Sequence, residues 1–367
     1  MRPAFILLTS ILLLIVFPGN SLAADCPEGP YDVRITDMYS DIDSGDLTVY
    51  SSIGLEGLDI ELQLEHEGEV LDITTVSIDS ISAGSNIVKV FEWDTDSKDD
   101  GKYTVRSRVT QGECELYSGN HSFVHGRQVI PRININDLAA NSEGASILIA
   151  PVQPVIMDIE FMLVDGQDVI YSAAQQKVSL HTQPGITEHT WNTLLAEGKD
   201  YRARVKINMY TPSESLVLME NFTAVEDVFI TDTYRDAVGA SATIEGRSQV
   251  PFTGSVKFTV TDSFGTVIEA ASERSPVLLN GDDETVETIW ENRLPEGSYR
   301  LTIEVPGSGG TILDRRETII EAAAVRRVAT ADNNTTENGS SQAPGFLGAH
   351  LMLAVAAVVL FLRMRSR

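Results

Sequence analysis

The stretch of sequence that decides the fold is WENRLPEGSYRLTIEV, residues 290–305. An extended segment ends at Trp290, and a second one opens at Tyr299 and then alternates apolar with polar residues. Alternation with a period of two is typical of a half-buried strand, and Pro295 and Gly297 are turn-forming residues. The stretch therefore predicts two strands joined by a tight loop.

The same pattern occurs three times along the chain. The tryptophans are spaced 98 and 99 residues apart, and the tyrosines that follow them are spaced 98 apart both times: Trp93, Trp191 and Trp290; Tyr103, Tyr201 and Tyr299. Each unit also begins with an alternating segment that ends in aspartate, at Asp37, Asp137 and Asp232. A period this long is one whole domain and not one repeat of a solenoid.

The fold class follows from the residue pattern within each unit. Short alternating segments are separated by Gly, Asp, Asn and Ser, and no stretch between the two chain ends has a clear helical period. The order Trp, turn, Gly-x-Tyr, alternating strand resembles fibronectin type III and bacterial immunoglobulin-like surface domains. The second unit departs from it by one inserted residue, Asp200. We predict an all-β chain of three tandem immunoglobulin-like β-sandwiches, with a signal helix before them and a hydrophobic helix after them.

The recurring aromatic residues have two interpretations. Exposed aromatic rings could stack on sugars, but one Trp and one Tyr at the same place in every unit fit the core and the tyrosine corner of a sandwich. We therefore predict that all six are structural.

The repeat also sets the domain boundaries. We predict a signal peptide over residues 1–24, sandwiches over 25–126, 127–225 and 226–321, a polar stalk over 322–343 and a C-terminal tail over 344–367. The stalk is too poor in apolar residues to form a core. The junctions between sandwiches are short, which favours stiff connections.

The N-terminus has the features of a secretory signal. Arg2 precedes a largely apolar run that ends at Phe17, and small residues follow up to Ala24. We expect cleavage after Ala23 or Ala24, and hence export.

The C-terminal tail has three parts in a fixed order. Pro344, Gly345 and Phe346 precede an uncharged run at 347–362, and Arg363, Arg365 and Arg367 follow as a basic stop. The run is short for a permanent span, and arginines mark the cytoplasmic end of a span. A buried terminal helix and an ordinary helix anchor are the alternatives.

This order of parts resembles the archaeal Pro-Gly-Phe sorting tail. The resemblance covers the last 24 residues. It implies that a membrane-embedded archaeosortase cuts near the tripeptide and transfers the protein to a lipid, leaving it on the outer face of the membrane without its helix. The logic parallels that of a GPI signal.

The charge and the cysteines limit the partners. A formal net charge of −26 argues against nucleic acid and against docking on anionic lipid headgroups. The two cysteines of an exported chain, Cys26 and Cys114, are expected to form a disulfide, with two free thiols as the alternative.

Modification and metal sites give weaker signals. Glycosylation motifs begin at Asn120, Asn221, Asn333, Asn334 and Asn338, and the last three crowd into the stalk. The acidic runs at 94–101 and at Asp41, Asp43 and Asp46 are read as solvated turns, with calcium as the alternative. His121 and His125 have no third ligand near them in the sequence. No metal or other cofactor is therefore expected.

No motif of a catalytic nucleophile, zinc helix, phosphate loop or dinucleotide site occurs in the sequence, so we expect no enzyme. The leading hypothesis is an exported glycoprotein, anchored through a processed tail, with a structural or adhesive role at the cell surface or in a surface layer. The alternative is an extracellular module that binds an envelope polysaccharide or a solute. Partners beyond the membrane and the processing enzyme are not specified by the sequence.

Overall fold

The computed structural model describes residue 26 and residues 31–95, 99–126, 131–211 and 213–323. They belong to one compact unit, Met1–Ala323, while the second unit, Ala324–Arg367, lies outside the described residues. The predicted signal helix, the tripeptide, the apolar run and the basic stop therefore lie outside the described part of the chain. So does the stalk beyond Ala323 with its three glycosylation motifs, whereas Ala322, predicted as the first stalk residue, ends a strand of the third sandwich.

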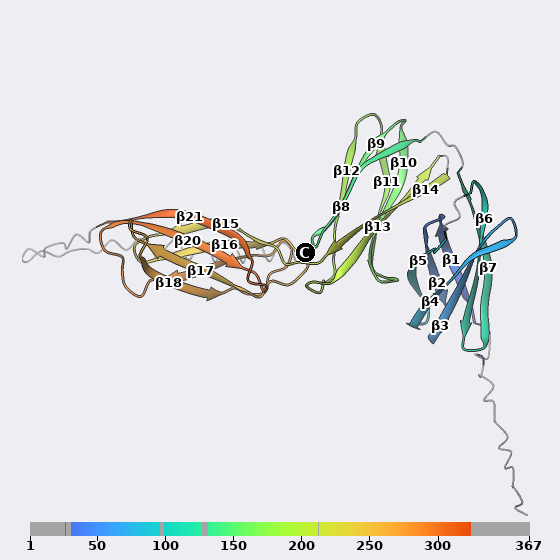
Figure 1. The fold of residues 1–367 in the computed structure, drawn as a ribbon, viewed down its shortest axis with the longest axis horizontal. Coiled ribbons are helices and arrows are strands. Elements are labelled where there is room, and N and C mark those ends of the chain that lie inside the picture. Colours follow the sequence, from blue (N-terminus) through green and yellow to red (C-terminus); the bar gives the residue numbers. More distant parts are fainter. Residues whose placement is uncertain (1–25, 27–30, 96–98, 127–130, 212, 324–367) are drawn as a thin grey trace, which may run out of the picture. The chain divides into compact units, whose positions relative to one another are not determined.

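The described residues form strands and no helix, so the all-β prediction is confirmed for them (Figure 1). The first seven strands are β1 (Val33–Ser40), β2 (Ser44–Ser51), β3 (Leu55–His66), β4 (Glu69–Ile81), β5 (Ser85–Glu92), β6 (Gly101–Gln111) and β7 (Cys114–His125). The next seven are β8 (Ile133–Ala140), β9 (Gly144–Pro151), β10 (Val155–Asp165), β11 (Asp168–Leu180), β12 (Gly185–Thr190), β13 (Asp200–Tyr210) and β14 (Ser213–Thr223). The last seven are β15 (Val228–Arg235), β16 (Gly239–Gly246), β17 (Ser255–Thr261), β18 (Val267–Arg274), β19 (Asp283–Ile289), β20 (Gly297–Pro306) and β21 (Ile312–Ala322).

Each group of seven strands forms a three-stranded and a four-stranded sheet around its own core. The three-stranded orders are β1-β2-β5, β12-β9-β8 and β15-β16-β19, and the four-stranded orders are β4-β3-β6-β7, β11-β10-β13-β14 and β18-β17-β20-β21. We refer to these groups as the first, second and third sandwich. Strands β5 and β11 also pair, at Lys89 and Asp168, which makes one seven-stranded sheet from the first and second sandwiches.

The period-two pattern of the sequence explains which face is buried. On β3, for example, Leu58, Ile60, Leu62 and Leu64 are fully buried, while the residues between them are half-buried or exposed. Successive side chains of a strand point to opposite faces, so this alternation places the apolar set in the core.

One irregularity recurs in all three sandwiches. The ladder between the first two strands shifts register after Ile35, after Ile135 and after Ile230, and in each case pairing resumes at the aspartate two residues later. A β-bulge of this kind leaves one residue unpaired and is a defined feature of a fold. The shared bulge allows residues of the three sandwiches to be matched position by position.

The tyrosine corners differ between sandwiches. The hydroxyls of Tyr103 and Tyr299 donate to carbonyl oxygens four residues upstream, at 2.8 and 3.2 Å. The hydroxyl of Tyr201 instead accepts a hydrogen bond of 3.1 Å from the backbone N–H of Ala196, five residues upstream. The extra residue Asp200 in the second unit accounts for this change of partner.

The predicted disulfide is confirmed. Cys26 and Cys114 are bonded, with their Cα atoms 5.6 Å apart, and the bond ties the chain before β1 to the start of β7. The pairing closes a loop that contains most of the first sandwich.

Candidate functional site

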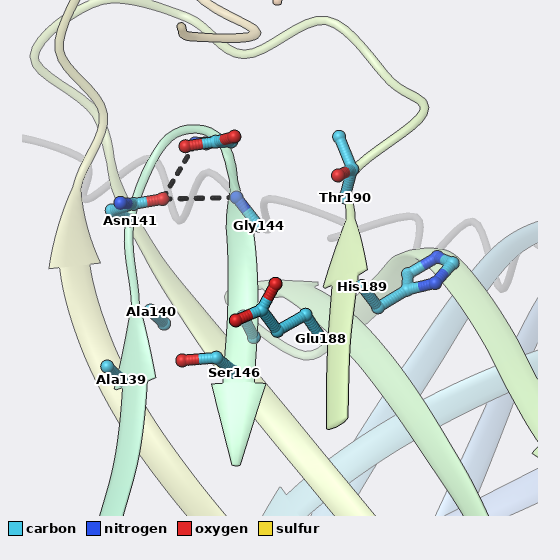
Figure 2. A pocket seen from close by; sticks show the side chains of 10 residues that line it. Ala139, Ala140, Asn141, Gly144, Ser146, Glu188, His189 and Thr190 are labelled. Atoms are coloured by element: carbon cyan, nitrogen blue, oxygen red, sulfur yellow. Dashed lines mark hydrogen bonds between the residues drawn. The ribbon is translucent and has the colours of Figure 1, made fainter. Parts of the chain in front are cut away.

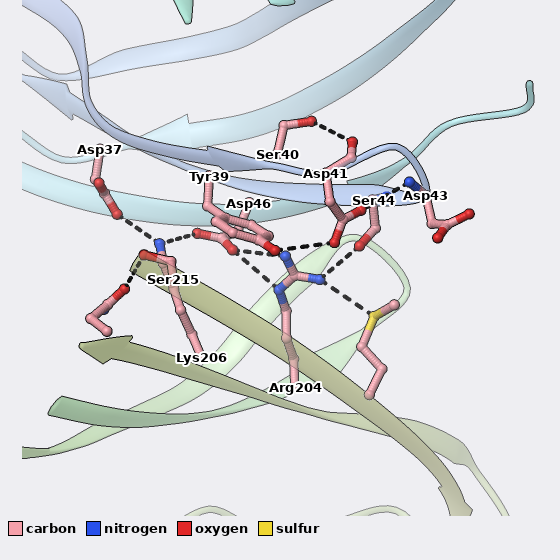
Figure 3. A network of polar contacts seen from close by, with 12 residues as sticks. Asp37, Tyr39, Ser40, Asp41, Asp43, Ser44, Asp46, Arg204, Lys206 and Ser215 are labelled. Atoms are coloured by element: carbon pink, nitrogen blue, oxygen red, sulfur yellow. Dashed lines mark hydrogen bonds and ion pairs between the residues drawn. The ribbon is translucent and has the colours of Figure 1, made fainter. Parts of the chain in front are cut away.

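A buried network of polar side chains links β1 and β2 of the first sandwich to β13 of the second (Figure 3). Arg204 is fully buried, and its Nε and Nη2 donate to one carboxylate oxygen of Asp46 at 3.2 and 2.8 Å. Its Nη1 donates to Ser44 Oγ at 3.1 Å. Lys206 Nζ donates to the other oxygen of Asp46 at 2.8 Å and to Asp37 at 3.0 Å. We name Asp37, Asp46, Arg204 and Lys206 the Arg204 network.

The Arg204 network contains two carboxylates and two cations, so its formal charges cancel. Burial lowers the pKa of Lys206, but the charge and hydrogen bonds of Asp46 and Asp37 outweigh it, so the pKa is raised overall. Lys206 is therefore a cation at neutral pH. Breaking a buried pair leaves an uncompensated buried charge, which makes this contact sensitive to the loss of Asp46, Arg204 or Lys206.

Tyr39 forms the aromatic wall of the network. The Arg204 guanidinium and the Lys206 ammonium lie 5.8 and 5.5 Å from the centre of its ring. Burial and the neighbouring carboxylate of Asp41 raise the pKa of Tyr39, so its hydroxyl stays protonated and donates to Asp41 at 3.1 Å. The ring thus lies beside both cations, whose side chains are 0% and 5% exposed.

Apolar contacts accompany the charges. Val90 of β5 is buried with Met162 and Val164 of β10, and Val88 and Val169 pack against them. The backbone N–H of Val90 donates to the carbonyl of Gln167 at 2.9 Å, and Lys89 forms an ion pair with Asp168. The outer face of β1-β2-β5 is thus packed on the outer face of the second four-stranded sheet.

A hollow of about 220 Å³ lies on the outer face of β8, β9 and β12 (Figure 2). Its walls are Ala139, Ala140, Asn141, Glu143, Gly144, Ala145, Ser146, Glu188, His189 and Thr190. Asn141 Oδ1 accepts hydrogen bonds from the N–H groups of Glu143 and Gly144, at 2.9 and 3.1 Å, and so fixes the loop at its rim. The wall residues include two carboxylates and neither Lys nor Arg, so the hollow favours a cation.

The recurring aromatic residues lie in the cores. Trp93, Trp191 and Trp290 are buried, as are Tyr103 and Tyr201, while Tyr299 is half-buried against its core. The three tryptophans, Tyr103 and Tyr201 are therefore not accessible for stacking on a sugar.

The acidic cluster at Asp41, Asp43 and Asp46 is organised by protein groups. Asp41 Oδ1 accepts from the backbone N–H groups of Asp43 and Ser44, at 2.9 and 2.7 Å, and Asp46 is paired with the two cations of the Arg204 network. The described residues contain no group of three or more His, Cys, Asp or Glu side chains placed to hold a metal ion. Part of the run at 94–101 lies outside the described residues.

The two histidines of β7 have separate surroundings. His125 contacts the Tyr103 ring edge-on at 6.3 Å between centroids, whereas His121 lines a small hollow with Asp37 and Asn120. Of the two glycosylation motifs in the described residues, Asn120 and Asn221 are both exposed, and Asn221 Oδ1 accepts a hydrogen bond of 3.0 Å from Arg202.

The pH dependence of stability follows from two half-buried histidines. Burial lowers the pKa of His121 and of His189, because the charged ring loses hydration. The folded chain then binds protons more weakly than the unfolded chain, so stability is lost as the pH falls below about 6.5, the ordinary histidine value. We expect the melting temperature to drop between about pH 6.5 and 5, and to drop less in the variant H121Q/H189Q. The exposed His181 supplies the control H181Q, and an equal pH slope in all three proteins would contradict the assignment.

Sequence reasoning missed Arg204 and Lys206. The signal was available, because Arg202, Arg204 and Lys206 alternate along one strand of a strongly acidic chain and therefore share its outer face. Their partners on β1 and β2 lie about 160 residues away, as in Arg204 and Asp46 with a separation of 158, and no local pattern connects them.

No protein-family model and no curated protein matches the chain. Among solved structures, a tetra-tandem repeat in the extending region of a large adhesion protein is 12% identical, over 81% of this chain and 75% of that one, with a TM-score of 0.24. Dimeric latent PorU from Porphyromonas gingivalis is 12% identical over 80% of this chain and 34% of its own, with a TM-score of 0.23. Trypsin-activated alpha-2-macroglobulin from Escherichia coli is 12% identical over 79% and 23%, with a TM-score of 0.22. The chain thus spans about a third of PorU and a quarter of the macroglobulin, and TM-scores this low carry no argument about function.

Proposed function

We propose that this chain is a non-enzymatic cell-surface protein with a structural or adhesive role, exported and then anchored through its processed C-terminal tail. The observation that carries the proposal is that successive sandwiches are coupled through buried, specific contacts. Relative motion of domains is the default when their interface is small and polar. Buried couplings at both junctions instead suit a protein that must hold a fixed spacing.

The second junction shows such coupling in detail. Val250, from the β16–β17 loop of the third sandwich, is buried in the core of the second. Its neighbour Gln249 donates its backbone N–H to Ser142 at 2.9 Å and accepts from the N–H of Leu195 at 3.1 Å. Ser248 Oγ donates to the carbonyl of Val225 at 2.7 Å. The loop is therefore held on several sides.

The alternative is a module that binds an envelope polysaccharide or a solute. The recurring tryptophans are buried and offer no face to a sugar, while Tyr210, Tyr234 and Phe264 are exposed. We prefer the structural role because of the buried contacts at both junctions.

Anchoring rests on the tail, which lies outside the described residues. Among those that are described, no helix is long and apolar enough to cross a membrane. The proposed anchor is a lipid that an archaeosortase-type enzyme attaches after cutting near Pro344, Gly345 and Phe346.

The test is the intact mass of the protein purified from the membranes of its own cells. We expect a mass without residues 363–367 and with an added lipid. Recovery of Arg363, Arg365 and Arg367 in the mature protein would contradict processing and leave an ordinary helix anchor. A protein found only in the culture medium, with no lipid, would contradict anchoring altogether.

A further inference from the structure

The docked face of the first sandwich has a counterpart on the second. In each three-stranded sheet we define a row as three residues that pair across the three strands, with its position counted from the shared bulge. One row of the first sandwich is Tyr39, Asp46 and Val90, and the other is Asp37, Thr48 and Val88. In the second sandwich the row matching Tyr39, Asp46 and Val90 is Ala139, Ser146 and Glu188. The row matching Asp37, Thr48 and Val88 is Asp137, Leu148 and Ile186. Arg204 and Lys206 lie across both rows of the first sandwich, and the hollow of the second sandwich is lined by its row of Ala139, Ser146 and Glu188.

The hollow has room for an arginine side chain. Ala139 stands in the place of Tyr39 and Ser146 in the place of Asp46, and both replacements are smaller. The lost carboxylate of Asp46 has a substitute in Glu188, which is the next residue in the same row (Figure 2). The negative charge has moved by one strand and is retained.

The second row keeps the other two features of the docked face. Asp137 occupies the position of Asp37, which binds Lys206 in the first sandwich. Ile186 occupies the position of Val88 and is 66% exposed, beside Leu148. An exposed isoleucine beside a half-buried leucine, next to two carboxylates, matches the combination that packs β1-β2-β5 on β10 and β13.

The complementary basic face also has a counterpart, on the first sandwich. Tyr103 of β6 and Tyr201 of β13 are equivalent, because each pairs with a phenylalanine of the next strand. Arg106 follows Tyr103 by three residues, as Arg204 follows Tyr201. Two residues beyond these stand Arg108 and Lys206. The side chains of Arg106 and Arg108 are 61% and 51% exposed and form ion pairs with Glu65 and Glu61.

We infer that the hollow on β8, β9 and β12 is the docking site for a second copy of this chain, which presents Arg106 and Arg108 of its β6. The contact repeats between copies the packing that joins the first and second sandwiches within a copy. Arg106 enters the hollow beside Glu188, and Arg108 approaches Asp137. Gln63 lies where Met162 supplies an apolar contact inside the chain, so the contact between copies is the weaker one.

The geometry of the contact determines the form of the assembly. The surface used on one copy differs from the surface used on the next, so the contact is heterologous. After one contact has formed, one of the two copies still has a free basic face and the other still has a free hollow. Such contacts build open chains of molecules unless the rotation closes a ring.

Salt should promote this assembly. Two copies that each carry a net charge of −26 repel one another at long range, and salt screens that repulsion. The contact pairs are partly buried in the assembly and are screened less. The inference goes beyond the proposed function, because it depends neither on the anchor nor on processing of the tail.

A mixing experiment with the full-length chain tests the inference. The variants Q63C and E188C are produced separately. They are produced without glycans, because Asn120 pairs with Arg106 in the β6–β7 ladder and a glycan there would cover the contact. Each variant alone and the mixture of the two are treated with a short bismaleimide in detergent at about 1 M NaCl. We expect covalent dimers in the mixture of Q63C and E188C and only monomers in each variant alone. Equal dimer formation in the separate samples would overturn a heterologous contact, and monomers throughout would overturn docking between copies.

A control at the third sandwich distinguishes the two available faces. Glu287 occupies the position of Glu188 in the row formed with Tyr234 and Ser241. We expect no cross-link between Q63C and E287C, and cross-linking there in place of E188C would overturn the assignment to the second sandwich.

Sedimentation provides a second readout that requires no cysteine. We expect the unmodified chain to sediment as larger species as the protein concentration rises at about 1 M NaCl, and the variant R106E/R108E to remain a monomer. The matched control R300E/R315E changes the net charge equally, at exposed arginines of β20 and β21 outside the contact, and should behave as the unmodified chain. Loss of assembly in R300E/R315E as well, or assembly retained in R106E/R108E, would contradict the inference.

Discussion

Replacing Asp46 by asparagine should separate the first two sandwiches. Asp46 is buried and binds both Arg204 and Lys206. In D46N the only carboxylate left to these two buried cations is Asp37, whose side chain is 64% exposed. Breaking a buried pair in this way costs about 3–5 kcal/mol. The chain can avoid most of that cost by undocking, which returns both cations to water.

Hydrogen exchange provides the measurement for D46N. The backbone N–H of Val90, which donates to Gln167 across the interface, should lose protection. The N–H groups of β3 in the core of the first sandwich should keep theirs. Unchanged protection at Val90 would show that the Arg204 network does not hold the interface together.

Two further variants separate charge from packing. D59N makes the same chemical change at an exposed carboxylate that accepts a hydrogen bond from Ser77, and it should alter stability by less than about 0.5 kcal/mol. The triple variant D46L/R204M/K206M removes all three buried charges at once and should keep the interface closed, because apolar replacement of a buried ion network is often neutral or stabilising. Separation in the triple variant would mean that the charges themselves are required.

The variant W191A should give the largest loss within a single core. Trp191 is fully buried in the second sandwich, and its Nε1 donates to the carbonyl of Asn141 at 2.9 Å. Truncating a buried tryptophan to alanine costs about 3–5 kcal/mol through lost burial and the cavity left behind. The carbonyl of Trp191 also accepts a hydrogen bond from Gln249, so we expect the second junction to loosen as well.

Denaturant unfolding checks this expectation. The midpoint of the second sandwich should fall, while Trp93 and Trp290 remain as fluorescent reporters of the other two. W191F keeps a six-membered ring and loses the indole hydrogen bond to the carbonyl of Asn141, so its cost should be about 1–3 kcal/mol, below that of W191A. W290A supplies the comparison in the third sandwich, where the loss should stay confined to that unit. An unchanged midpoint in W191A would mean that Trp191 is not a core residue.

Local pattern was sufficient for the strands and for the class of fold. The alternation after Tyr299, and its counterparts after Tyr103 and Tyr201, identified the strands because a strand shows its two faces in the sequence with a period of two. The spacing of Trp93, Trp191 and Trp290 identified the repeat. The pairing of Cys26 with Cys114 followed from their number, since two cysteines permit one bond.

The sequence by itself thus determined the all-β class, the threefold repetition and the disulfide, because each depends on neighbours along the chain, on a fixed period or on a count. The tertiary structure alone decided that Asp46 meets Arg204, that Val250 enters the core of another sandwich and that Glu188 lines a hollow. These contacts join residues far apart in the sequence across the faces of sheets. Which outer faces come together depends on shape and charge across two surfaces, and no single strand records that match.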